Sequence, residues 1–441
     1  MKKMSKTLTR QYFDIKDAKF ADHTSLENGV LSISKEELLA EAKPLMKAVK
    51  SVDFEIVKPG ENTRIIHLLD TIQPMIKVEG EGQQYSGYFS DPHMVGEGKT
   101  NLLSGFAVME SAALPWDDSS ASSGLLYPRD AIMDMTGPIA DVTPFSKTIN
   151  LVIVYELEKG KSSIEYDTDI RNIGIKVSTY LAAVTKEMEP DSTEDFSIDE
   201  VNPDLPNVVF VWNSQNQGPY SNTFIYGHPI DNMVPTLFHP NELMDGCVVS
   251  GNYVWPAFKV PTYLYVNSPI LLELYKEHGK TINFRGVIFG RSHNPSNWHK
   301  TRCAQVAVKI AQYLDADGLV MAWEGGGNAA VDGMLTIQCA EKHGIKASTI
   351  TFEFGGVDGT EGILLVDDVP EADAVISGGS IEKPFTIPDV DRVVGGDVFR
   401  LNKESGGFFP PSNKELRFEQ TTHLYIGGNQ AGASTLFAEE Y

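Results

Sequence analysis

The chain has 441 residues, of which 41% are hydrophobic and 22% are charged, an ordinary balance for a globular protein. Its 37 Lys and Arg residues against 60 Asp and Glu give a formal charge of −23. This charge argues against nucleic acids and anionic membranes as partners, because both favour basic surfaces. At this length we expect two or three domains.

Cysteine usage and the N-terminal residues indicate the compartment. Cys247, Cys303 and Cys339 form no CxxC pair, which is typical of a reducing environment. The first twenty residues lack the apolar segment of a signal peptide, and no run approaches the roughly 18 apolar residues of a membrane span. We therefore expect a cytoplasmic protein in which Cys303 and Cys339 pack inside helices.

Residues 1–145 are expected to form a β-rich domain. Short apolar segments broken by Gly and Pro predict strands at Gly29–Ser34, Arg64–Leu69 and Pro74–Val78. Ser34 precedes a helical pattern at Lys35–Val49, and Glu37 follows three residues later, as in a capped helix start.

Residues 146–255 are expected to form an α/β domain. An apolar strand at Ile149–Tyr155, a helix around Ile164–Met188 and a strand at Val208–Trp212 give the strand–helix–strand order of a parallel sheet. The acidic segment Glu189–Pro206 is interpreted as a surface connection.

Residues 256–441 repeat this alternation more clearly. The predicted strands are Phe284–Phe289, Leu319–Trp323, Ser348–Phe354 and Ala374–Ile376. The first helix between them has Ala307, Ile310, Ala311 and Leu314 on one face, and the second spans Ala329–His343. The predicted fold class is α/β, with a β-rich N-terminal part followed by two doubly wound parallel-sheet domains.

Gly-rich segments follow the predicted strands of the last third. They lie at 324–328, 354–359, 377–380 and 427–432. Free backbone amides at a helix start bind small anions well. None of the segments has the GxGxxG or P-loop pattern, and each one alone is more often a tight turn. Only their combination at one sheet edge indicates a small anionic group.

Single polar residues give further candidates. Glu324 ends a predicted strand beside three glycines and is the best-placed carboxylate for acid–base or binding chemistry. Glu353 and Asp358 follow for the same reason, although each could equally cap a helix or a turn. Cys247 is a candidate nucleophile, but a buried structural cysteine is the commoner case.

No histidine set has the spacing of a zinc site. His239 and Glu242 have an H-x-x-E spacing, but Pro240 argues against a regular metal-binding helix there. The residues predict no defined metal site, and a metal ion stays open as a cofactor.

Segments along most of the chain are similar to component B of glycine, sarcosine and betaine reductases. These are Ser25–Leu31, Val57–Glu61, Ile76–Gly80, Asp134–Gly137, Thr143–Thr148, Asp245–Asn252, Asn267–Ile270, Leu274–Lys280, Glu324, Gly325, Gly327 and Asn328. The resemblance implies a precursor that is cut before a cysteine, whose residue becomes a pyruvoyl group that captures an amino substrate. It also implies a separate selenoprotein-type partner subunit that takes the carbon fragment.

Tyr253 stands where this family has the cysteine. The acyl shift that cuts the chain needs a Ser, Thr or Cys side chain next to the preceding carbonyl, and the following elimination needs a heteroatom on Cβ. Tyrosine offers neither, so we expect an uncut chain without a pyruvoyl group. Cys247 and Ser250 are chemically competent neighbours, and displaced processing at one of them stays open.

Three classes of function remain. The first is an enzyme subunit that acts on a C–N bond of a small amine or amino-acid derivative, in a hetero-oligomer with the partner subunit. The second is a repurposed hydrolase of a small amide or lactam. The third is a non-catalytic subunit that binds substrate or serves as a scaffold.

The expected site combines the loops at 239–253, 324–328 and 353–359. The candidate catalytic residues are Tyr253, Glu324 and Cys247, with Tyr253 as a phenol donor or a wall of the pocket. The candidate substrate-binding residues are His239, Asn252, Asn328, Glu353 and Asp358.

Overall fold

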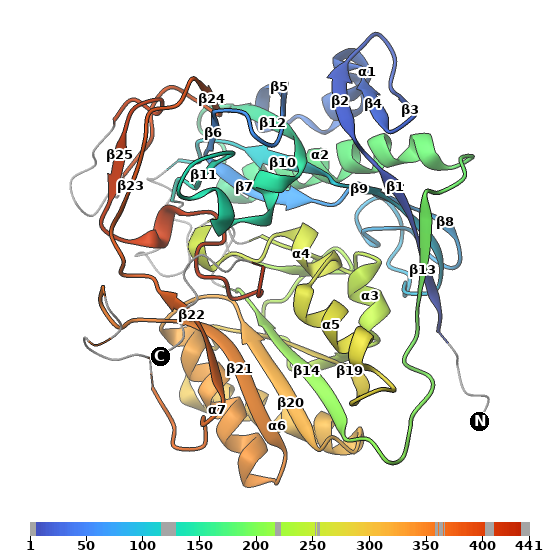
Figure 1. The fold of residues 1–441 in the computed structure, drawn as a ribbon, viewed down its shortest axis with the longest axis vertical. Coiled ribbons are helices and arrows are strands. Elements are labelled where there is room, and N and C mark those ends of the chain that lie inside the picture. Colours follow the sequence, from blue (N-terminus) through green and yellow to red (C-terminus); the bar gives the residue numbers. More distant parts are fainter. Residues whose placement is uncertain are drawn as a thin grey trace.

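The computed structural model describes residues 6–115, 129–216, 222–251, 253, 256–357, 360, 365, 367–401 and 410–433. Asn252 and Asp358, two of the predicted site residues, lie outside these ranges. The fold is mixed α/β with several mixed sheets, which confirms the predicted class. Figure 1 shows a β-rich region above a second region that is built on a large parallel sheet.

The β-rich region contains two four-stranded sheets. One has the order β13 (Ser192–Phe196), β1 (Leu8–Asp14), β9 (Gly98–Ser104) and β8 (Met75–Glu79). The other has the order β5 (Val49–Val57), β12 (Ile149–Leu157), β10 (Phe106–Ser111) and β7 (Leu68–Ile72). A small sheet of β2 (Asp17–Phe20), β4 (Val30–Ile33) and β3 (Ser25–Glu27) lies beside them.

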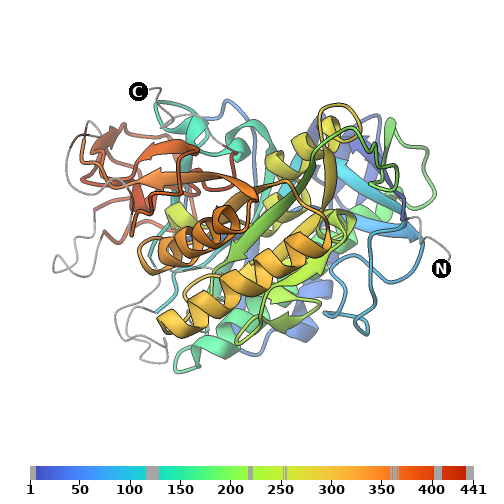
Figure 2. The ribbon, with the colours of Figure 1, turned by 90° about the horizontal axis from the view of Figure 1, so that it is seen from below.

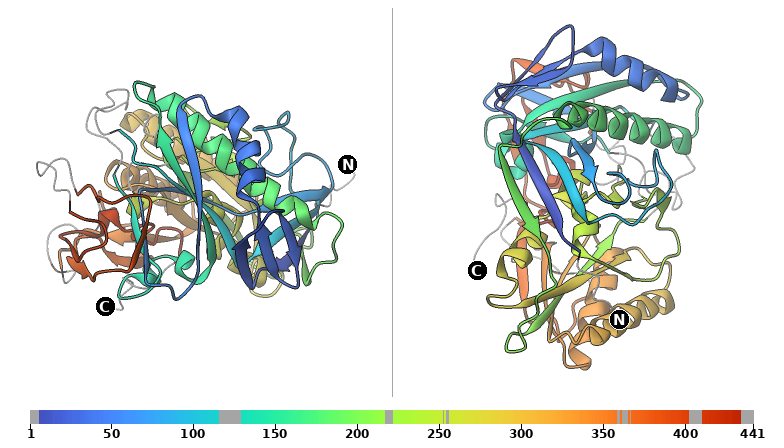
Figure 3. Two further views of the ribbon diagram at one scale, coloured as in Figure 1. Left: turned by 90° about the horizontal axis from the view of Figure 1, so that it is seen from above. Right: turned by 90° about the vertical axis from the view of Figure 1, so that its right-hand side faces the viewer.

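Two helices cover this region. They are α1 (Lys35–Ala42) and α2 (Ser163–Ala182). Figure 3 shows them together at the end of the molecule opposite to the second region. The α2 helix starts at a capping box of Ser162 and Glu165 and buries Ile170 and Ile173 in the apolar cluster of the β-rich region.

The second region is built on a six-stranded sheet. Its order is β17 (Thr236–Phe238), β19 (Asn283–Arg291), β14 (Asn207–Ser214), β20 (Gly318–Trp323), β21 (Lys346–Glu353) and β22 (Val375–Ser380), with only β17 antiparallel to its neighbour. One face is covered by α6 (Asn297–Tyr313) and α7 (Asn328–Lys342), which lie side by side in Figure 2. The other face packs against α4 (Thr262–Val266) and α5 (Pro269–Glu277).

The alternation of side chains along β14 explains why both faces are buried. Val209 and Val211 pack under α6 and α7, whereas Phe210 and Trp212 face the opposite core. This opposite core also contains Leu8 of the β-rich region. The two regions therefore share one continuous apolar core.

Smaller elements complete the fold. One small sheet has the order β11 (Ile132–Asp134), β6 (Thr63–Ile66) and β24 (Arg392–Val394), and a second pairs β23 (Phe385–Ile387) with β25 (Leu416–Phe418). A third has the order β16 (His228–Pro229), β15 (Phe224–Ile225) and β18 (Val248–Val249). The short helix α3 spans Pro240–Met244. Because β24 pairs with β6, a late segment of the chain joins the β-rich region. No helix among the described residues is both long and apolar enough to cross a membrane.

The strand–helix–strand unit expected at 149–212 is not formed. Its first strand, β12, pairs with β10 and β5, whereas its second strand, β14, lies in the six-stranded sheet. Within the described ranges only one doubly wound sheet is present, not two. Local patterns indicate strands and helices but not their partners, because strand pairing is decided by contacts far apart in the sequence.

Three further local predictions differ from the structure. The strand expected at Arg64–Leu69 is broken at His67, which has a positive φ of 55°. The helix expected at Lys35–Val49 ends at Ala42, because Pro44 follows and cannot donate a backbone hydrogen bond. The Gly-rich segment 377–380 lies inside β22 rather than after it.

Candidate functional site

The segment that resembles the processing site runs between the two regions. Asp245 is fully buried and accepts hydrogen bonds from the backbone N–H of Gly96 (2.9 Å) and from Thr100 Oγ1 (2.6 Å). Its carboxylate also forms an ion pair with Lys77. The start of the segment is thus held firmly against β8 and β9 of the β-rich region.

The end of the segment is held by α2 and α4. Ser250 donates its N–H to Thr262 Oγ1 (2.9 Å), and its carbonyl accepts from Arg171 Nη1 (2.8 Å). At Gly251 a Cβ atom would lie 1.7 Å from the carbonyl oxygen of Asn222, so no larger residue fits this backbone path.

Tyr253 follows this clamp and is 3% exposed. Its ring packs in the apolar cluster of the β-rich region. Lys259 Nζ lies 5.1 Å from the ring centroid, and the guanidinium carbon of Arg171 lies 5.9 Å from it. Burial raises the pKa of the phenol well above its ordinary value, so Tyr253 keeps its proton.

Lys259 connects Tyr253 to the neighbouring polar groups. Its ammonium donates to Ser250 Oγ (2.9 Å) and lies 3.4 Å from Asp70 Oδ1. Burial lowers the pKa of Lys259, because the charged form loses its hydration. Asp70 also accepts from the backbone N–H of Thr262 (3.0 Å). Lys259 and Ser250 therefore have the geometry of a base beside a hydroxyl.

Glu110 is the least satisfied group of this cluster. It lies on β10 and is 0% exposed, and among the residues that the structure describes neither of its carboxylate oxygens has a hydrogen-bond partner. Burial raises its pKa well above the usual range, and the nearby carboxylate of Asp70 adds to that shift. Glu110 is therefore a protonated acid inside the core, where an unpaired carboxylate would be costly.

Glu324 lies at the carboxyl end of β20, as predicted, and is also fully buried. It accepts hydrogen bonds from Ser214 Oγ (3.0 Å) and from the backbone N–H groups of Gln215 (2.6 Å) and Val260 (2.8 Å). In the sheet β14 lies between β19 and β20, and the chain goes first from β14 to β19 and then crosses back over β14 to β20. Glu324 therefore lies at the point where the strand order reverses, which is where such sheets hold ligands.

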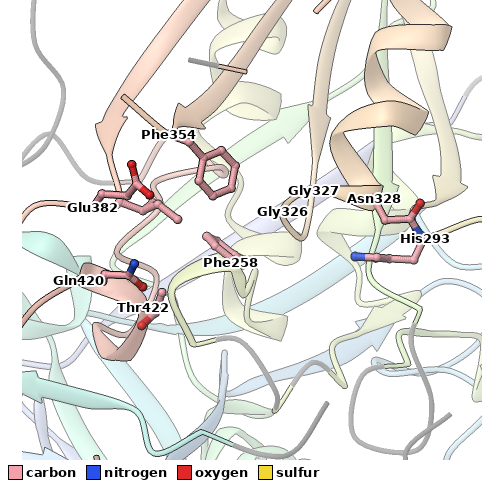
Figure 4. Close-up of a pocket in the computed structure, with 10 residues that line it drawn as sticks. Phe258, His293, Gly326, Gly327, Asn328, Phe354, Glu382, Gln420 and Thr422 are labelled. Atoms are coloured by element: carbon pink, nitrogen blue, oxygen red, sulfur yellow. The ribbon is translucent and has the colours of Figure 1, made fainter. Parts of the chain in front are cut away.

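A cavity of about 320 Å³ opens at the same sheet edge. It is lined by Phe258, His293, Gly326, Gly327, Asn328, Phe354, Ile381, Glu382, Gln420 and Thr422 (Figure 4). Asn328 is a predicted site residue, and its neighbours 324–327 form the predicted Gly-rich loop. Tyr253 is not among the lining residues. The charged cluster and the cavity are linked by the short stretch from Phe258 to Val260.

Two other predicted residues, His239 and Glu353, have structural hydrogen-bond partners, and a third, Cys247, is buried. His239 caps α3, where its Nδ1 accepts from the backbone N–H of Asn241 (3.3 Å), and burial lowers its pKa to about 4. Cys247 is 1% exposed, and burial raises the pKa of its thiol well above the usual range. Glu353 is buried and accepts from Ser377 Oγ (2.8 Å).

Sequence reasoning missed the charges around Tyr253. Glu110 and Asp70 lie in short apolar strands, and Arg171 forms an i,i+4 ion pair with Asp167 on α2. A charged residue inside an otherwise apolar strand was the available signal, because such a residue must be buried. Among the residues that the structure describes, no three His, Cys, Asp or Glu side chains are placed to hold a metal ion.

Comparison with known proteins places the chain among amino-acid reductase subunits. The family model described as glycine/sarcosine/betaine reductase component B subunits matches residues 6–439. The chain is 38% identical over 438 residues to the glycine reductase complex component B subunits alpha and beta of Acetoanaerobium sticklandii, covering 97% of this chain and 98% of that protein.

A second relative gives the same picture. The chain is 35% identical over 434 residues to the sarcosine reductase complex component B subunit alpha of Peptoclostridium acidaminophilum, covering 97% of this chain and 98% of that protein. No solved structure matches.

Proposed function

Because the chain belongs to the family of glycine/sarcosine/betaine reductase component B subunits, we propose that it acts, uncut, in a reductase-like complex on a C–N bond of a small amine or amino-acid derivative. The observation that carries this proposal is the position of Tyr253. Its phenol lies in a buried cluster with Lys259, Arg171 and Glu110, on the segment that resembles the processing site.

The residues present do not fit a pyruvoyl group at position 253. The tyrosine Oη is separated from Cβ by the whole ring, so it cannot attack the carbonyl of residue 252. Its Cβ bears only carbon and hydrogen, so no heteroatom can leave by elimination. The buried ring of Tyr253 also fills the position in which a pyruvoyl group would stand. No step of the proposed reaction is therefore routed through a pyruvoyl group.

The cluster has the groups needed for proton transfer to a leaving amine. Tyr253 and Glu110 both hold a proton because burial disfavours their charged forms. Lys259 has a lowered pKa, which brings its neutral form within easier reach. In the proposed site Tyr253 donates a hydrogen bond or forms a wall, and Glu324 orients the Gly-rich loop. The electrons for a reductive cleavage come from a selenoprotein-type partner subunit.

Intact mass spectrometry of the purified chain tests whether it stays whole. We expect one species near 48.5 kDa. Two shorter polypeptides, the second with a blocked N-terminus at position 247, 250 or 253, would contradict the proposal. Tyr253→Cys is the matched variant, since it restores the family residue in the same buried segment. If this variant is cut and the wild type is not, the tyrosine is the reason why the wild-type chain stays whole.

The Ser250–Lys259 pair favours hydrolysis as the second candidate function. A lysine of lowered pKa 2.9 Å from a serine hydroxyl resembles the nucleophile–base pairs of serine–lysine hydrolases. Incubating the chain alone with small amides and lactams, and measuring released ammonia or amine, separates the functions. Turnover without a partner that is lost in Ser250→Ala supports the hydrolase. Turnover only with the reducing partner supports the reductase-like complex. A complex that keeps full activity with Tyr253→Phe and Lys259→Met would reduce this chain to a scaffold.

A further inference from the structure

The outer face of α6 and α7 differs in charge from the rest of this acidic chain. The two helices lie side by side on one face of the six-stranded sheet (Figure 2). The 17 residues of α6 include three Lys or Arg and no Asp or Glu, although the whole chain carries a formal charge of −23. Trp298 is 65% exposed and Tyr313 is 78% exposed, the highest values among the large apolar side chains that the structure describes. Two such rings on one helix indicate a surface that another molecule covers.

Basic side chains accompany both rings. The guanidinium carbon of Arg302 lies 5.6 Å from the centroid of the Trp298 ring, and Lys309 Nζ lies 5.8 Å from that of Tyr313. Each pair is spaced by four residues, so ring and charge share one side of the helix. Among the residues that the structure describes, neither Arg302 nor Lys309 forms an ion pair. Because Trp, Tyr and Arg dominate the energetics of protein interfaces, this positive stripe favours an acidic protein surface as its partner.

The neighbouring helix continues the face with an uncharged stripe. Val331, Leu335 and Cys339 follow one another at intervals of four residues and are only half-buried. The charged residues of α7 are a buried aspartate and two residues of the last turn. A helix that is apolar on its outward side as well as its inward side is typical of a covered position. The stripe of α7 therefore fits the middle of an interface.

An acidic segment borders α7 on the side away from α6. Asp367, Asp368 and Asp373 are exposed on the stretch that leads into β22. Glu371 holds this stretch to the end of α7, where it accepts a hydrogen bond from Gln338 Nε2 (3.2 Å). Since β22 is the edge strand beyond β21, and α7 packs on β20 and β21, the acidic segment and α6 lie on opposite sides of α7. The face is thus positive, apolar and negative in that order.

This order makes the face complementary to itself. The acidic segment lies beside the end of α7. Trp298 and Arg302 lie beside its start, where Lys300 of α6 donates to the carbonyl of Asn328 (2.9 Å). A two-fold axis through the middle of α7 lays this helix antiparallel on its copy and exchanges the two ends. It therefore brings the acidic segment of each copy onto Trp298 and Arg302 of the other, as a closed symmetric contact requires.

We propose that α6, α7 and residues 367–373 form the interface of a homodimer, in which α7 packs on α7 and the acidic segment contacts Arg302 and Trp298 of the second copy. Two chains of the same large negative charge repel each other, so they associate where opposite charges meet locally. The inference goes beyond the proposed function and does not depend on it, because Trp298, Arg302 and Leu335 lie outside both the cluster around Tyr253 and the lining of the cavity.

Sedimentation velocity of the intact chain at micromolar concentration tests the proposal. We expect a species of twice the chain mass of 48.5 kDa. Arg302→Glu should weaken the dimer by about tenfold or more, and so should Asp368→Lys combined with Asp373→Lys, because each places like charges together. Combining all three substitutions should restore the dimer, which a misfolded variant could not do. Arg417→Glu, an exposed reversal of the same kind on β25, is the matched control and should dimerise as the wild type does.

Cross-linking locates the two-fold axis. Leu335→Cys in a Cys339→Ser background should be joined to its copy by a bis-maleimide that spans about 10 Å, the usual distance between packed helices. Ser192→Cys, exposed on β13, should give no linked dimer in the same background. A wild type that is monomeric, alone or bound only to a different protein, would overturn the proposal. A dimer without rescue by the combined reversal, or without cross-linking at position 335, would also overturn it.

Discussion

At the scale of single residues, the chemistry around Tyr253 is controlled by loss of water. Glu110 and Tyr253 keep their protons because burial disfavours their charged forms, and burial draws the pKa of Lys259 in the opposite direction. Arg171 is also buried, but it keeps its charge beside Asp167. The cluster thus contains two acids that hold protons and one base that holds its proton less tightly than usual.

Replacing Glu110 by Gln should change how stability depends on pH. The pKa of Glu110 is higher in the folded chain than its ordinary value of 4.5, so the folded state binds this proton more tightly than the unfolded state. Its contribution is fully present below pH 4.5 and is lost as the pH rises toward the folded pKa. We expect Glu110→Gln to gain stability relative to the wild type by about 1 kcal/mol or more between pH 5 and pH 7.

Urea unfolding of both proteins at the two pH values measures this difference. Glu158→Gln is the matched control, because Glu158 is exposed on the turn after β12. If the difference in the free energy of unfolding between the wild type and Glu110→Gln does not change with pH, Glu110 is ionised in the folded chain.

At the scale of elements, the packing of α2 on β10 depends on a glycine. At Gly174 a Cβ atom would lie 2.0 Å from Glu110 Oε1 and 2.8 Å from Ile72 Cδ1. The helix therefore approaches the strand more closely than any other residue would permit, and the Glu110 carboxyl is enclosed by backbone. An interior glycine normally costs a helix about 1 kcal/mol, so this position trades helix propensity for close packing.

Gly174→Ala should therefore destabilise the protein, by about 1–3 kcal/mol, although the same change stabilises most helices. In a Glu110→Ala background the clash with the carboxyl is gone and only the contact with the end of the Ile72 side chain remains, so Gly174→Ala should destabilise the protein much less than in the wild type. Denaturant unfolding of the four proteins gives the coupling between the two sites. Additive effects of the two substitutions would mean that the helix does not rest on Glu110.

At the scale of the whole molecule, the segment from Asp245 to Tyr253 is a buried connection rather than an exposed cleavage loop. Its beginning is tied to β8 and β9, its end to α2 and α4, and every described residue between them is buried. The apolar core is also continuous between the two regions. We expect the chain to unfold in one cooperative step, because one large apolar cluster is built from residues of both regions and joins the clusters that lie within each region.

Asp245→Asn tests the tie between the segment and the β-rich region. The substitution leaves the buried ammonium of Lys77 without its charged partner. Breaking a buried pair in this way costs about 3–5 kcal/mol. We expect a loss of that order in the free energy of unfolding, with a single transition retained. Asp195→Asn, at an exposed hydrogen bond to Thr9, should change stability by less than about 0.5 kcal/mol. Two separate transitions in either protein would contradict the shared core.

Local pattern by itself determined the elements of the last third of this protein. The strands and helices from Phe284 to Glu353 lie where the apolar runs and the 3.6-residue periodicity predict them, since those signals come from neighbouring residues. The sequence alone also shows the tyrosine at position 253 and the resemblance to a reductase family that has a cysteine at this position. The position of Glu324 at a strand end was also predicted.

Only the tertiary structure decided which strands pair and which charges meet. β12 joins β5 and β10 rather than β14, because pairing depends on burial of whole faces and not on order along the chain. Asp70, Glu110, Arg171 and Lys259 come from four separate elements or loops, and no spacing in the sequence relates them. Asp70, Arg171 and Lys259 are charged groups that find partners inside the fold, because buried charges are stable only together, whereas burial of Glu110 favours its neutral form.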